Sequence, residues 1–152
     1  MADVLISYHP DSTGETVRRI AAALEANGIS CWYAAKELYD KDCVGEIARE
    51  IRKCRVFLLA LNQDALKSRY MESEAALAYR RVMNRERLTF LCFLTDNCDW
   101  KDSPIASYLN RAQIMDGDFP VAELCDRIAR IVRGKPIRRP AERTASRPAE
   151  NL

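Results

Sequence analysis

Short apolar runs alternate with amphipathic segments along most of the chain, and this alternation constrains the fold more than any other feature. The runs that predict strands are residues 4–6, 29–33, 56–61, 88–94 and a weak fifth at 114–115. They show little polar alternation, which is typical of a parallel sheet covered on both faces. We therefore expect right-handed βαβ units in which each strand is followed by a crossover helix.

The segments between these runs show the spacing of apolar residues that is typical of amphipathic helices. After the capping residues 11–13, apolar residues recur at helical spacing from Val17 through Ile20 and Ala21 to Leu24. Asn27-Gly28 predicts the end of that helix. Three more helices are marked by Ile47, Ile51 and Cys54, by Ala75, Ala76, Ala78 and Val82 before Asn84, and by Val121, Leu124, Ile128 and Ile131 before Gly134. The pattern predicts an α/β fold, a flavodoxin-like three-layer sandwich with a mostly parallel five-stranded sheet, which binds ligands beyond the carboxyl ends of its strands.

The composition changes near residue 135. Residues 1–134 predict one domain, whereas residues 135–152 are rich in Pro, Arg, Ala and Glu and predict a disordered tail or a linker to a sensor or effector domain. Five basic and two acidic residues give the tail +3, so the formal charge of +2 leaves −1 for the domain. From this near-neutral charge we expect no basic face and no nucleic-acid binding by the domain itself.

The sequence shows no sign of export or membrane insertion. Its apolar runs fall far short of the roughly 20 residues that cross a bilayer, and the start at Met1-Ala2-Asp3 lacks a basic leader segment. We therefore expect a cytoplasmic location.

The six cysteines form no Cys-x2-Cys pair, and His9 is the only histidine. We expect reduced thiols in the core, with no disulfide, metal or resident cofactor.

The sequence motifs of several catalytic, nucleotide-binding and signalling families are absent from the chain. The five glycines are scattered, and neither G-x-G-x-x-G, G-x4-G-K-[ST] nor G-x-S-x-G occurs. A receiver domain shares the expected strand order, but it needs an aspartate pair after its first strand and an aspartate at the end of its third. Ser7-Tyr8-His9 and Leu61-Asn62 stand at those places. The pattern therefore excludes a receiver domain.

Three segments together resemble the TIR domain family. Residues 3–8 (DVLISY) resemble the D-V-F-I-S-Y box that opens TIR domains. Residues 24–34 (LEANGISCWYA) resemble the bacterial stretch L-E-x-x-G-I-x-C-W-x-A-P-R-D, and residues 68–74 (SRYMESE) resemble S-x-W-x-x-x-E. The resemblance covers about residues 3–133 and is of the bacterial type.

This resemblance implies a signalling domain, and one chemistry in particular. Many bacterial and plant TIR domains cleave NAD, as substrate rather than cofactor, into nicotinamide and ADP-ribose or a cyclic or conjugated product. The family's catalytic glutamate lies four positions after the aromatic residue of the third segment, which carries over to Glu74. Glu72 lies two positions after Tyr70, on a different face of the helix. By itself, Glu74 would be an ordinary glutamate at a helix start, favoured there by the helix dipole.

The same resemblance suggests which residues surround Glu74. Tyr8 and His9 follow the first strand, Trp32 and Lys36 lie near the end of the second, and Tyr70 lies one helical turn before Glu74. We expect the aromatic rings to stack on nicotinamide or adenine and the basic groups to meet the pyrophosphate. Each of two residues also has an alternative role that involves no substrate. Trp32 is compatible with a core residue, and Lys36 is compatible with an exposed charge in a loop.

The chain departs from the family in the loop at residues 34–43. The A-P-R-D of the family reads Ala34-Ala35-Lys36-Glu37 here, so the proline is lost, Lys replaces Arg and Glu replaces Asp. Later in the loop, Asp40-Lys41-Asp42 stands where the family usually has P-G.

We expect an NAD glycohydrolase or ADP-ribosyl cyclase of bacterial antiphage or stress signalling, activated by self-association with other TIR domains. The alternative is a non-enzymatic TIR scaffold that pairs through this loop. A nucleoside deoxyribosyltransferase-like enzyme would leave Trp32 and the Ser7-Tyr8 box unexplained.

Overall fold

The computed structural model describes residues 2–33, 41–135 and 137. Its centre is a five-stranded, wholly parallel sheet with the order β2-β1-β3-β4-β5. The strands are β1 (Val4–Ser7), β2 (Cys31–Trp32), β3 (Val56–Leu61), β4 (Thr89–Leu94) and β5 (Gln113–Met115). This is the flavodoxin-like order, so the predicted fold class is confirmed.

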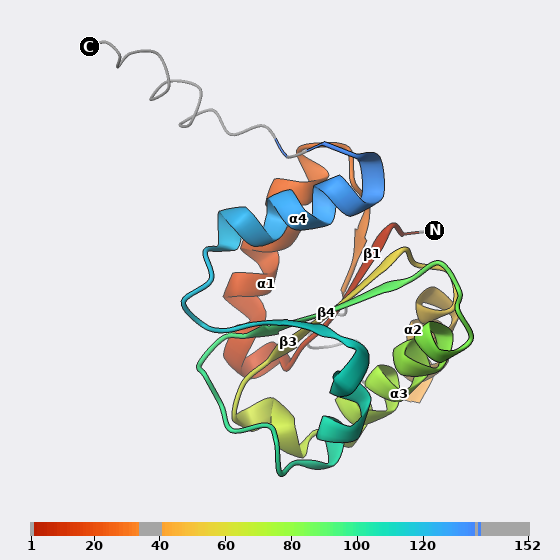
Figure 1. The fold of residues 1–152 in the computed structure, drawn as a ribbon, viewed down its shortest axis with the longest axis vertical. Coiled ribbons are helices and arrows are strands. Elements are labelled where there is room, and N and C mark those ends of the chain that lie inside the picture. Colours follow the sequence, from red (N-terminus) through yellow and green to blue (C-terminus); the bar gives the residue numbers. More distant parts are fainter. Residues whose placement is uncertain (1, 34–40, 136, 138–152) are drawn as a thin grey trace.

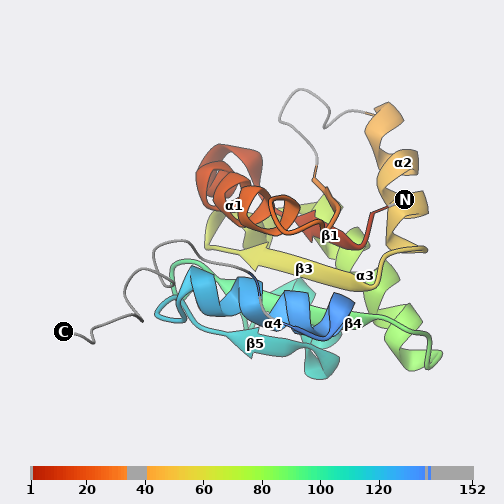
Figure 2. The same ribbon diagram turned by 90° about the horizontal axis from the view of Figure 1, so that it is seen from above.

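Helices cover both faces of the sheet (Figures 1 and 2). α1 (Pro10–Glu25) and α4 (Val121–Arg133) pack on one face, and α2 (Lys41–Ile51) and α3 (Arg69–Met83) pack on the other. Two 3₁₀ segments, η2 (Asp64–Lys67) and η3 (Pro104–Arg111), follow β3 and β4. Among the helices of the described residues, none is long and apolar enough to cross a bilayer.

The core divides into two clusters because side chains alternate along each strand. In β1, Leu5 belongs to the cluster under α2 and α3, whereas Val4 and Ile6 belong to the cluster under α1 and α4, as does Tyr8 directly after the strand. β3 is buried over its whole length. Of the cysteines whose side chains the structure describes, Cys54, Cys92, Cys98 and Cys125 are buried and Cys31 is half-buried, and all five are free. They fill the core as expected, and Cys43 lies outside the described side chains.

Three element boundaries differ from the sequence-based expectation. α1 begins at Pro10 with His9 as its N-cap, ahead of the predicted capping residues 11–13, because proline suits the first helical position. β2 is only two residues long. α3 begins at Arg69, six residues before Ala75, the first apolar residue that marks this helix in the sequence, because the Ser68 Oγ accepts a hydrogen bond from the Met71 N–H at 3.2 Å.

Candidate active site

The site lies at the point where the strand order reverses, between β1 and β3. Ligands of such sheets bind beyond the carboxyl ends of the strands at this switch point. Ser7 is the last residue of β1, is 1% exposed and pairs with Leu59 of β3. It shares a sheet face with Leu5, two positions earlier, so its hydroxyl points toward the side covered by α2 and α3.

Glu74 approaches Ser7 from the buried side of α3. Met71, Ala75 and Ala78 form the face of this helix that packs on the sheet, and Glu74 lies on the same face, 6% exposed. The Ser7 Oγ donates a hydrogen bond to the Glu74 Oε1 at 2.5 Å. Glu72 is half-buried and lies off this face. The structure therefore separates the two glutamates as the helical spacing predicts.

The environment of Glu74 disfavours its charged form. Burial raises the pKa of Glu74 from its ordinary 4.5 to about 7, and the hydrogen bond from Ser7 opposes part of that rise. Glu74 forms no ion pair with another described residue. Of the four buried polar residues in the described part of the chain (Ser7, Thr13, Asn62 and Glu74), Glu74 is the only ionisable one. A buried carboxylate with a pKa raised by desolvation is a functional-site candidate when it borders a cavity.

Glu74 does border a cavity. The cavity has a volume of about 390 Å³ and lies between α2 and α3. Its lining combines apolar residues of α2 and α3 (Ile47, Ala48 and Leu77) with polar residues of α3 (Arg69, Tyr70, Ser73 and Glu74). Such a mainly apolar hollow with a few convergent polar groups is typical of a small-molecule site.

The structure brings together some of the residues predicted to surround Glu74. Tyr70 lines the cavity and is 50% exposed, so its ring is available to a ligand. Trp32 pairs with Leu5 and packs against the same core cluster as α3, which puts it on the Glu74 side of the sheet. Lys36 lies outside the described residues.

Of the other two predicted residues, Tyr8 lies on the opposite side of the sheet. Tyr8 is 3% exposed and packs in the cluster under α1 and α4, with its ring 6.1 Å from that of Tyr33. The sheet thus separates its ring from Glu74, because Tyr8 follows Ser7 and points to the opposite face. His9 is the N-cap of α1, where its carbonyl accepts hydrogen bonds from the Thr13 N–H and Oγ1. Its part in substrate binding stays a prediction.

Three residues of the site were not expected from the sequence. Ser7 binds Glu74, and Arg69 and Ser73 line the cavity. One signal for Ser7 was present, since it is the only polar residue in a strand that is otherwise Val-Leu-Ile. No group of His, Cys, Asp or Glu among the described residues is placed to hold a metal ion.

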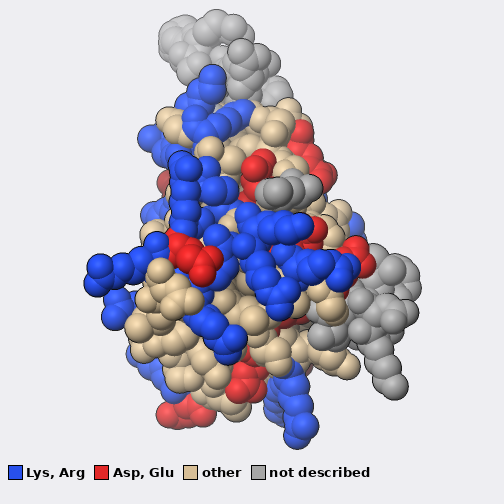
Figure 3. All heavy atoms as spheres, turned by 90° about the vertical axis from the view of Figure 1, so that its right-hand side faces the viewer, with Lys and Arg blue, Asp and Glu red and all other residues tan. Residues whose placement is uncertain are grey.

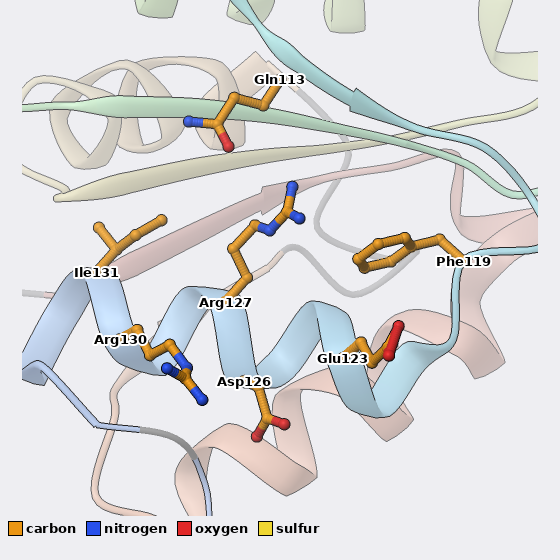
Figure 4. A pocket seen from close by; sticks show the side chains of 7 residues that line it. All are labelled: Gln113, Phe119, Glu123, Asp126, Arg127, Arg130 and Ile131. Carbon is orange, nitrogen blue, oxygen red and sulfur yellow. The ribbon is translucent and has the colours of Figure 1, made fainter.

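A larger hollow, of about 620 Å³, lies on the opposite side of the sheet between β5 and α4 (Figure 4). The Arg127 guanidinium stands 5.1 Å from the centre of the Phe119 ring there, and Gln113 faces it from β5. Its acidic and basic residues balance, as Glu123 and Asp126 accompany Arg127 and Arg130. This hollow contains no buried ionisable group comparable to Glu74, so it is not the candidate active site.

Ser7→Ala tests the electrostatic link between the two residues. Because the Ser7 hydrogen bond favours the carboxylate, its removal is expected to raise the pKa of Glu74 above about 7. An NMR titration of the Glu74 carboxyl carbon measures this change. Ser73→Ala is the matched control, since Ser73 lines the same cavity but donates its hydroxyl to the Arg69 carbonyl. An equal pKa in all three proteins would contradict the contact.

Known protein families and structures agree with this architecture. The family model described as TIR domain matches residues 4–129. No curated protein sequence matches the chain. Among solved structures, the TIR domains of the activated Roq1 resistosome, which directly recognises the pathogen effector XopQ, match with a TM-score of 0.55 at 19% identity over 72% of this chain and 69% of that one.

Two animal proteins give similar matches. A metazoan TIR-STING receptor from C. gigas matches with a TM-score of 0.60 at 19% identity over 90% of this chain and 41% of that chain, so this chain spans less than half of that receptor. The TIR domain of the Toll-related receptor TRR-2 from Hydra magnipapillata matches with a TM-score of 0.55 at 17% identity over 86% of this chain and 90% of that chain. At these identities the likeness shows the fold alone, whereas the family model spans most of the sequence: the chain belongs to the TIR domain family.

Proposed function

We propose that this TIR domain cleaves NAD at the bond between nicotinamide and ribose, with Glu74 as the catalytic carboxylate. The observation that carries the proposal is the position of Glu74, which is buried, hydrogen-bonded to Ser7 at the carboxyl end of β1 and open to a cavity between α2 and α3. Its place in the third family-like segment supports the same role.

One carboxylate is sufficient for this chemistry. Breaking the bond from ribose to nicotinamide passes through an oxocarbenium-like transition state, as in glycoside hydrolysis. The nicotinamide ring is cationic in NAD and leaves as a neutral molecule, so no general acid is needed. A carboxylate beside the ribose stabilises the developing positive charge and can hold the ribose hydroxyls. Water, an adenine nitrogen or another nucleophile then completes the reaction, which gives ADP-ribose, a cyclic isomer or a conjugate.

The charge of the substrate suits the raised pKa. A buried carboxylate without a cationic partner is unfavourable in its ionised form, and this is why the pKa of Glu74 reaches about 7. A nicotinamide ring in the cavity would bring a positive charge beside Glu74 and favour its ionisation. Substrate binding and activation of the carboxylate would then be coupled.

The cavity and its side of the sheet offer complementary groups for the rest of NAD. Tyr70 and Trp32 are the aromatic residues on this side of the sheet that we propose to stack on the nicotinamide or adenine ring. Arg69 lines the cavity with a guanidinium that suits the pyrophosphate, and we propose the same role for Lys36. The biological setting we propose is bacterial antiphage or stress signalling, with activity increased when copies of the domain self-associate.

The test is an assay of the full chain with NAD. Purified protein at high concentration, with and without a crowding agent, is expected to release nicotinamide, detected by chromatography together with the ADP-ribose product. Activity per molecule should rise with protein concentration if self-association activates the domain. Absence of nicotinamide at every concentration would rule out the proposal and leave the non-enzymatic scaffold as the function.

A further inference from the structure

Cations of this domain are concentrated at the end of the sheet where β3 and β4 begin, opposite the end at which Ser7 contacts Glu74. Three segments meet there: residues 52–55, which precede β3; residues 80–87, at the end of α3 and before β4; and residues 130–135, at the end of α4. We call their combined surface the basic face. Figure 3 shows Lys and Arg side chains gathered over this side of the molecule, with smaller acidic patches between them.

Hydrogen bonds hold the three segments together. The Arg81 Nη1 donates to the carbonyls of Ile51 and Cys54 at 2.8 and 2.7 Å, and so joins α3 to the segment before β3. The Arg55 Nη2 donates to the Ile131 carbonyl at 3.0 Å and joins that segment to α4. The basic face is therefore a fixed part of the fold.

The charge of the basic face is far from that of the whole chain. Its three segments contain ten Lys or Arg residues and one acidic residue, Glu86, which gives a formal charge of +9. Because the whole chain carries +2, all remaining residues together carry −7. The expectation of no basic face, drawn from the net charge, is therefore wrong, since a net charge averages over segregated surfaces.

Structural roles account for only part of this charge. Helices of a parallel α/β fold end at this edge, and cations near their last carbonyls are stabilising. Arg55, Arg81 and Arg133 have that role, since each donates to a carbonyl of a neighbouring segment. Seven other cations are exposed, and their side chains form no ion pair or hydrogen bond with a described residue: Arg52, Lys53, Arg80, Arg85, Arg87, Arg130 and Lys135.

We propose that the basic face binds the phosphate backbone of nucleic acid, without sequence preference. Guanidinium groups match phosphate geometry through paired hydrogen bonds, and clustered cations gain free energy by releasing the counterions of the polyanion. Arg52, Arg80 and Arg81 also line a hollow of about 300 Å³ between α2 and α3, together with Glu86, which forms an ion pair with Arg81 at 2.8 Å. Because Glu86 neutralises Arg81, the positive charge available to a phosphate there comes from Arg52 and Arg80.

The composition of the face favours nucleic acid over a membrane or a protein partner. Docking to a bilayer or to a protein usually buries large apolar side chains at the centre of the contact. Of the large apolar residues exposed in the described part of the chain (Tyr70, Met83 and Ile114), only Met83 belongs to the basic face. The face therefore offers charge and little apolar surface to a partner.

The experiment measures binding of the full chain to a short fluorescein-labelled DNA duplex by fluorescence anisotropy over a series of salt concentrations. The face variant replaces four exposed cations by glutamine: Arg52→Gln, Lys53→Gln, Arg80→Gln and Arg87→Gln. The control variant makes the same change in net charge elsewhere: Arg18→Gln, Arg19→Gln, Lys67→Gln and Lys101→Gln. All eight residues are exposed, so circular dichroism should show both variants folded.

The face variant is expected to bind at least about tenfold more weakly, with the slope of log affinity against log salt flatter by about 3 to 4. The control variant should bind nearly as well as the natural protein. Equal losses in both variants, or no binding to the duplex, would overturn the proposal. So would sedimentation with phosphatidylserine vesicles in place of duplex binding. Glu74→Gln should leave duplex binding unchanged, which makes this test independent of the proposed NAD cleavage.

Discussion

Glu74→Gln is expected to reduce nicotinamide release from NAD by on the order of 10²- to 10³-fold. Glutamine has nearly the same shape and keeps an oxygen that accepts the hydrogen bond from the Ser7 Oγ, so the site should stay folded. It carries no negative charge at any pH. The loss would therefore measure the stabilisation that a carboxylate gives to the positive charge developing on the ribose in the transition state.

Glu72→Gln is the matched control for this prediction. It makes the same chemical change two residues earlier on α3, at a half-buried position off the face that contacts the sheet. Nicotinamide release should remain close to that of the natural protein. If both variants lose activity equally, the effect comes from the helix or its charge and not from the position of Glu74. If neither loses activity, Glu74 has no catalytic part.

Much of the fold could be predicted because strong local signals agree with it. β3 spans the predicted residues because it is an uninterrupted apolar run that is buried on both faces. α4 ends at Arg133, directly before the predicted Gly134, which has a φ of 83° in the left-handed region that favours glycine. η3, in contrast, was not predicted. It begins at Pro104 and has too few turns to give a clear helical period.

The site was less predictable than the fold. Glu74 could be chosen over Glu72 only through the resemblance to TIR domains. The contact with Ser7 joins residues 67 positions apart and depends on which face of β1 meets α3. The same alternation turns Tyr8 away from Glu74, although Tyr8 is adjacent to Ser7. The basic face was missed for a similar reason, since its three segments come together only in the folded chain.

Glu74 is also expected to make the stability of the domain depend on pH. The pKa of this carboxyl is about 7 in the folded chain and 4.5 when exposed. Between these values the folded state holds the proton more tightly than the unfolded state, so the free energy of unfolding falls as the pH rises. Below about pH 4.5 the effect is absent, and above about pH 7 it is complete. A difference of 2.5 pKa units corresponds to about 3 kcal/mol.

Glu74→Gln removes this titration and isolates the effect from all other carboxylates. Relative to the natural protein, the variant should gain stability progressively from about pH 4.5 to about pH 7, by roughly 3 kcal/mol, and then hold a constant advantage. Urea unfolding at a series of pH values measures the difference, and Glu72→Gln should show no comparable trend. A difference that does not change with pH would mean that Glu74 titrates normally. A pH-dependent gain would show that the fold retains a destabilising carboxylate, which is expected where that carboxylate serves a function.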